Sequence, residues 1–153
     1  LAQEMFLADG LVDPAVSEFH LTGNPAFDKI LALPHGKTPG WTDRHFPGVG
    51  GRIAALHADM PAWLDAVNNR SYFKIEADVT AELEACYMAT MANGATYLVR
   101  PHPSQDRAFY ERWLADRPDA FLAADCPLHE LLANVDLLLA RSTTVGLEAA
   151  LMR

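Results

Sequence analysis

The sequence predicts an α/β fold in which a parallel sheet is flanked by helices. In the second half of the chain, short apolar runs alternate with segments of helical periodicity, as in strands and helices joined by right-handed crossovers. Leu137–Ala140 is apolar throughout, as parallel strands covered on both faces are. The 153 residues are 50% hydrophobic, and a chain of this length buries about two-thirds of its unfolded surface in one core.

The first third of the chain contains fewer regular elements. Residues 1–11 have helical periodicity, Phe19–Thr22 is a short strand, and Phe27–Leu33 is a short helix. From Pro34 to Gly51 proline and glycine are dense, which predicts a loop or linker.

The remaining elements follow in order. Arg52–His57 is the first strand of the sheet, and a helix follows at 61–68. The next helix begins at an N-cap, Asp78, and ends at Asn93-Gly94. After it the sequence predicts strand Thr96–Arg100, helix Gln105–Asp116, strand Ala120–Ala123, helix Leu128–Ala133, strand Leu137–Ala140 and a helix from Thr144.

Two strand ends carry polar residues suited to an anion. One strand ends in Arg100-Pro-His-Pro103, and another runs into Arg141 and then Ser142–Thr144 at the start of a helix. Hydroxyls and free backbone N–H groups at a helix start bind phosphate. Because ligands bind outside the carboxyl ends of parallel strands, we expect both segments to contribute to one site.

These motifs resemble a known family. Arg-Pro-His-Pro, then Leu-His-Glu-Leu-Leu-Ala-x-Val-Asp, then Ser-Thr-Thr-Val-Gly-Leu-Glu-Ala-Ala is similar to the C-terminal, donor-binding half of GT-B glycosyltransferases. Their relatives include UDP-N-acetylglucosamine 2-epimerase, capsule and polysialyl-type transferases, and CDP-glycerol glycerophosphotransferases. Leu21–Asp28 is similar to the segment that enters the hinge of these enzymes. The resemblance covers residues 19–31 and 95–152 and is weak between them.

The resemblance implies a division of the chain. Residues 1–33 are the end of an N-terminal domain and its hinge, 34–51 are a linker, and 52–153 are a Rossmann-like nucleotide-sugar-binding domain, truncated at its C-terminus. A complete GT-B enzyme has two such domains, so we expect a fragment or a short gene product without the catalytic base. The chain alone is then expected to be inactive.

The resemblance also implies roles for individual residues. His102 is the catalytic residue that donates to the leaving phosphate, and Glu148 binds the ribose hydroxyls of the donor. The remaining substrate-binding residues contact phosphate; they are Arg100, Arg141, Ser142, Thr143 and Thr144.

Each of these residues has a purely structural alternative. His102 is otherwise a strand-end residue bonded to a neighbouring carbonyl, and the hydroxyls of Ser142–Thr144 are a helix cap. Glu148 is otherwise an exposed helix residue favoured by the dipole, and a solvated side chain is the commoner state of arginine. Gly146 indicates close approach either of a ligand or of a neighbouring helix. His129 and Glu130 resemble a Leu-His-Glu-Leu-Leu segment that in similar proteins positions the base or simply packs; capping and solvation is the preferred interpretation.

Composition restricts the partners. The net charge of −8 disfavours nucleic acid, which requires a basic surface, and the longest apolar runs are too short to span a membrane. Cys86 and Cys126 lack zinc or disulfide spacing, which favours reduced cysteines in the cytosol. We therefore expect a cytoplasmic protein, or a peripheral one at the inner membrane, that uses no metal and no cofactor.

Three functions are compatible with this pattern. The first is transfer of a sugar from a nucleotide-sugar or CDP/CMP-linked donor to a glycan or lipid-linked acceptor in surface polysaccharide assembly. The second is a 2-epimerase, which is disfavoured because its Asp-Ser-Gly-Gly turn is Arg141-Ser-Thr-Thr here. The third is a module that binds a nucleotide or a protein without turnover.

Overall fold

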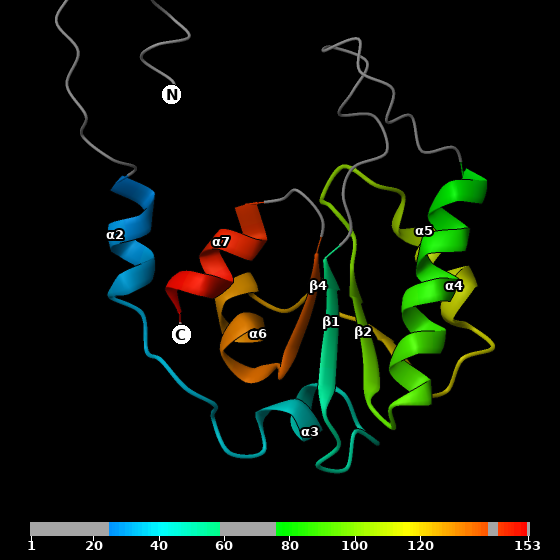
Figure 1. The fold of residues 1–153 in the computed structure, drawn as a ribbon, viewed down its shortest axis with the longest axis horizontal. Helices are drawn as coiled ribbons and strands as arrows, with labels where there is room; N and C mark the ends of the chain where they lie inside the picture. Colours follow the sequence, from blue (N-terminus) through cyan, green and yellow to red (C-terminus); the bar gives the residue numbers. More distant parts are fainter. Residues whose placement is uncertain (1–24, 59–75, 141–143, 153) are drawn as a thin grey trace, which may run out of the picture.

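The computed structural model describes residues 25–58, 76–140 and 144–152 (Figure 1). Within them a four-stranded parallel sheet is flanked by helices on both faces, which confirms the predicted Rossmann-like α/β class. The helix expected at 1–11, the strand Phe19–Thr22, the helix at 61–68 and residues 141–143 lie outside the described residues.

The sheet has the strand order β3-β2-β1-β4. Its strands are β1 (Ala54–Ala58), β2 (Thr96–Arg100), β3 (Ala120–Leu122) and β4 (Leu137–Ala140). The two central strands, β1 and β2, are almost completely buried. Because all pairs are parallel, the carboxyl ends of the four strands lie along one edge, which we call the carboxyl edge; the opposite one is the amino edge.

Two helices cover one face of the sheet. These are α4 (Glu76–Ala92) and α5 (Arg107–Leu114). Their apolar side chains pack on the odd-numbered positions of β2, Tyr97 and Val99. On this face the buried imidazole of His57 lies 2.6 Å from the Tyr97 hydroxyl, and its other nitrogen lies 3.6 Å from Glu82. His57 is thus part of a buried polar network.

The other face is covered by α6 (Leu128–Asn134) and α7 (Thr144–Leu151), with α2 (Pro25–Leu31) packed against α7. A short helix, α3 (Trp41–His45), lies at the amino edge. The core on this side joins all of these elements; its fully enclosed members include Leu56, Leu98, Ala123 and Leu131.

The stretch 34–51, expected as a loop or linker, is largely irregular but contributes to this core. It contains α3, and its side chains Trp41, Phe46 and Val49 are buried against the sheet side of the molecule. Apolar burial therefore fixes this segment to the fold.

Some element boundaries differ from the predictions. Helix α4 begins at Glu76, so Asp78 lies in its first turn instead of capping it. The helix predicted at Gln105–Asp116 is shorter, because the Asp106 carboxylate caps it by accepting from the Ala108 N–H at 3.0 Å. Strands β2 and β4 and the start of α7 coincide with the predicted residues.

The expectation that Leu137–Ala140 is covered on both faces is wrong for the described residues. Leu137 is 49% exposed, and the other three residues of β4 are half-buried or exposed. The physical reason is position: β4 is the outer strand of the described sheet and pairs there with β1 alone. Among the described helices, none is both long and apolar enough to cross a membrane.

Candidate functional site

The strand order locates the expected ligand crevice. Successive crossovers step from β1 to β2 and β3 on one side, and the chain then returns to place β4 on the other side of β1. In sheets of this kind the crevice lies between the carboxyl ends of the two strands where the direction reverses. Here those strands are β1 and β4, so the segment after Ala140 begins at the crevice and the end of β2 lies one strand further along.

His102 lies at this carboxyl edge, two residues beyond β2. The backbone N–H of Ser104 donates to His102 Nδ1 at 3.2 Å, and the Ser104 hydroxyl lies 2.7 Å from the same nitrogen. In a neutral imidazole one nitrogen accepts and the other carries the proton. With Nδ1 accepting, the proton resides on Nε2, which has no partner among the described residues. The half-buried ring thus offers one oriented donor.

Arg100 is bound within the fold. Its Nη1 donates to the carbonyl of Ala123 at 2.9 Å and to that of Cys126 at 2.6 Å. The guanidinium therefore fixes the loop that follows β3 through Nη1, so the side chain is not simply solvated.

A second arginine fixes the same loop. Arg107, in the first turn of α5, forms a bidentate pair with Asp125 at 2.6 and 2.9 Å. The hydrogen bonds from Arg107 hold the pKa of the Asp125 carboxyl below its usual value. Together, Arg100 and Arg107 connect the segments after β2 and β3, so the backbone around His102 is held from two sides.

Helix α7 begins at Thr144, directly after the segment 141–143. Thr144 is exposed, and a Cβ placed on Gly146 meets no described atom within 4 Å. A neighbouring helix among the described residues therefore does not require glycine at this position. Among the described residues, the space next to Gly146 is therefore open.

Glu148, one turn further along, is held by a residue from another helix. His129 Nε2 lies 2.9 Å from Glu148 Oε2, and the side chains are 39% and 18% exposed, respectively. Because a carboxylate only accepts, the Nε2 atom of His129 carries the proton. The second carboxylate oxygen, Oε1, has no partner among the described residues.

The structure thus brings the predicted residues together only in part. His102, Thr144 and Glu148 belong to segments that start at the carboxyl edge, whereas Arg100 is engaged in the scaffold. The predicted residues Arg141, Ser142 and Thr143 lie outside the described residues. Sequence reasoning missed the role of His129, because its contact with Glu148 depends on how α6 packs on α7. It also missed Ser104, although the spacing of two residues between His102 and Ser104 is a signal that the sequence contains.

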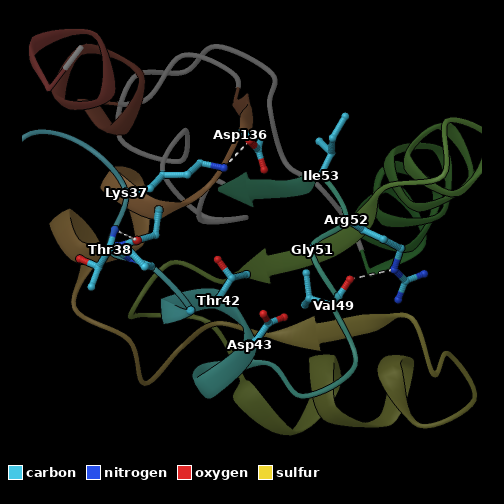
Figure 2. A pocket seen from close by; sticks show the side chains of 12 residues that line it. Lys37, Thr38, Thr42, Asp43, Val49, Gly51, Arg52, Ile53 and Asp136 are labelled. Atoms are coloured by element: carbon cyan, nitrogen blue, oxygen red, sulfur yellow. Dashed lines mark hydrogen bonds and ion pairs between the residues drawn. The ribbon is translucent and has the colours of Figure 1, made fainter.

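A cavity of about 240 Å³ lies at the opposite, amino edge (Figure 2). Lys37 reaches the carboxylate of Asp136, which also accepts from the Ala54 N–H at 2.9 Å. Three further polar lining residues are similarly engaged: Asn134 accepts from the Thr38 N–H at 2.7 Å, Asp43 from the Gly50 N–H at 3.0 Å, and Arg52 pairs with Asp119 at 2.8 Å. The cavity is roomy, but these groups bind each other.

Among the described residues, the cysteines and the metal-ligating residue types do not form a competing centre. Cys86 and Cys126 are thiols outside any disulfide bond, and burial raises the pKa of the Cys126 thiol, which disfavours the reactive thiolate. Within 25–58, 76–140 and 144–152, no three His, Cys, Asp or Glu side chains are grouped as metal ligands.

Comparisons of the chain with protein-family models, with curated proteins and with solved structures find no match. The resemblance to GT-B proteins therefore depends on the sequence motifs alone. What the structure adds independently is the Rossmann-like strand order and the placement of these motifs on it.

Proposed function

We propose that this chain binds the nucleotide of an activated sugar donor, as part of a glycosyltransferase in surface polysaccharide or glycoconjugate assembly. The observation that carries the proposal is the strand order β3-β2-β1-β4, which places the reversal point between β1 and β4. The Ser-Thr-Thr segment follows β4 directly, and His102 follows the next strand beyond β1.

The spacing of these strands suits a nucleoside diphosphate. Since neighbouring strands lie about 4.8 Å apart, the ends of β2 and β4 are separated by roughly 10 Å. A diphosphate held by the hydroxyls and N–H groups at the start of α7 would extend toward His102 across the end of β1. The Nε2–H of His102 is the donor that would meet a phosphate oxygen.

Glu148 suits the nucleoside end of the donor. A carboxylate that accepts from two vicinal hydroxyls orients a ribose without a metal. The His129 contact occupies Oε2 of Glu148, and Oε1 is the atom available for ribose. Open space at Gly146, one half-turn earlier on α7, permits a ligand to approach the helix backbone closely.

The proposed chemistry is transfer with departure of the nucleotide. An acceptor oxygen attacks the anomeric carbon, the bond from that carbon to the diphosphate oxygen breaks, and the diphosphate leaves with the bonding electrons. Oriented donors stabilise the negative charge on the leaving group, and His102 with the start of α7 fills this role. The base that removes the acceptor proton lies outside this set of residues.

Calorimetric titration of the chain with UDP, CDP and CMP, with and without a chelator, tests the proposal. We expect weak binding of at least one pyrimidine nucleotide that is insensitive to chelator. A folded chain that binds none of them contradicts donor binding, and a strict magnesium requirement contradicts the metal-free site. Binding without transfer in a complete two-domain protein would favour the non-catalytic module, and exchange at the sugar C2 would favour the epimerase.

A further inference from the structure

The hydrogen bond between His129 and Glu148 joins two helices of unequal burial. α6 is anchored in the core by Leu131 and Leu132, whereas no residue of α7 is fully buried. A glutamate has several rotatable bonds, so a carboxylate on the outer helix is poorly oriented unless something holds it. His129, on the better-anchored helix, supplies that constraint at 2.9 Å.

We propose that His129 is a positioning residue for ribose recognition, acting through Glu148. This inference rests on the proposed function and deepens it, because it predicts that the site recognises a ribonucleotide and rejects the deoxyribonucleotide. His129 does not touch the ligand. It fixes Oε2 of Glu148, and the planar geometry of the carboxylate then restricts the position of Oε1, the oxygen proposed to accept from ribose.

The chemistry of the pair favours this role over a simple surface ion pair. An exposed pair contributes little stability, but the Glu148 side chain is only 18% exposed and has one carboxylate oxygen without a partner among the described residues. A preorganised acceptor of this kind discriminates strongly, because a ligand without the hydroxyl leaves it unpaired.

The test compares ribonucleotides with their 2′-deoxy counterparts. UDP, 2′-deoxy-UDP, CDP and 2′-deoxy-CDP are titrated into the wild-type chain and the variants E148A, H129A and H129Q. Wild type should prefer the ribonucleotide by roughly 10- to 100-fold, the effect of one hydrogen bond to a charged group. E148A should abolish the preference, and H129A should reduce it to a few-fold while binding of the deoxynucleotide stays nearly constant.

H129Q provides the rescue. A glutamine amide places an N–H donor near the position of the histidine Nε2, so H129Q should retain most of the preference lost in H129A. The matched control is H35A, since His35 connects the residue that follows α7 with α2, through the carbonyls of Met152 and Leu31. H35A should keep the wild-type preference, which separates positioning of Glu148 from general loosening of α7.

The outcomes distinguish the inference from the proposed function. If H129A binds both nucleotides like wild type while E148A loses the preference, the inference is overturned and donor binding stands. A wild-type chain that binds both nucleotides equally overturns ribose recognition by this pair but leaves a nucleotide site. If the folded wild type binds none of the four probes, the proposed function fails and the inference fails with it.

Discussion

The two edges of the sheet use their polar residues in opposite ways. At the amino edge a cavity of about 240 Å³ is lined by charged and polar groups that bind one another, among them Lys37, Asp136 and Asn134. At the carboxyl edge His102 and Glu148 are each held by one neighbour and keep one further atom without a partner among the described residues.

This difference shows that available volume and capacity to bind are separate properties. A ligand that binds Lys37, Asp136 or Asn134 in the amino-edge cavity would compete with existing hydrogen bonds, and each replaced bond gains little. At the carboxyl edge a ligand adds hydrogen bonds to atoms whose geometry is already fixed. The amino edge instead stabilises the fold, since Asp136 binds both Lys37 and the first amide of β1.

The largest expected effect concerns the carboxyl edge. In a transferase that contains this domain, His102→Ala should lower turnover by roughly 2–4 kcal/mol of transition-state stabilisation, the effect of losing one oriented donor. Steady-state kinetics on folded protein measures it. Glu148→Ala should mainly raise the KM for the donor, because it acts on the ground state and the transition state alike. Wild-type kinetics in both variants would contradict the ligand-binding role assigned to the carboxyl edge.

Arg100→Met sharpens the comparison within the carboxyl edge. It leaves the carbonyls of Ala123 and Cys126 without their donor, so we expect about 1–3 kcal/mol of lost stability. Urea denaturation measures the loss, and nucleotide titration of the folded variant should show little change in affinity. A large loss of affinity without a loss of stability would support the phosphate contact predicted for Arg100 from the sequence.

At the amino edge, Lys37→Met removes the ion pair with Asp136. The Lys37 and Asp136 side chains are 52% and 33% exposed, and exposed pairs contribute about 0–1 kcal/mol. The free energy of unfolding should therefore fall by no more than this, and nucleotide affinity should not change. A marked loss of UDP or CDP binding in this variant would place the ligand at the amino edge and contradict the proposed difference between the two edges.

The smallest effect is a pH dependence at His35. Its two ring nitrogens face the carbonyls of Met152 and Leu31, and these hydrogen bonds raise its pKa above the usual 6.5. A raised pKa in the folded state gives stability that is complete below the unfolded pKa and is lost as pH rises through the folded pKa. Denaturant midpoints of wild type should thus fall as pH increases from about 6.5.

His35→Gln is the matched variant for this measurement. It lacks the titrating group, so its midpoint should change less across the same pH window. Equal pH dependence in both proteins would show that the two carbonyls do not bind an imidazolium.

The sequence predicted the helix and strand boundaries that are set by particular residue types. Strand β2 ends where Pro101 and Pro103 follow, and α7 starts at the end of the hydroxyl-rich sequence Ser142–Thr144, so local rules located both. The burial of β4 was not predictable, because an apolar run does not reveal whether its strand is central or outer. The exposure of Leu137 depends on the strand order, which is a property of the whole chain.

The same division applies to the candidate site. His102 was located by its motif, but its tautomer depends on the backbone N–H of Ser104. The pair His129–Glu148 spans 19 residues and two helices, and its formation depends on interhelical packing that no local pattern encodes. The hydrogen bonds of Arg100 could not be predicted for the same reason, since its carbonyl partners lie 23 and 26 residues away.

The pairing of β1 with β4 has a consequence for the order of folding. Ala54 and Asp136, which bind each other at the start of the two strands, are 82 residues apart along the chain. Closing so long a loop costs more entropy than the shorter β1–β2 and β2–β3 crossovers, so we expect β4 to dock last. The ligand crevice would then be absent from earlier intermediates, and a nucleotide would stabilise only the completed fold.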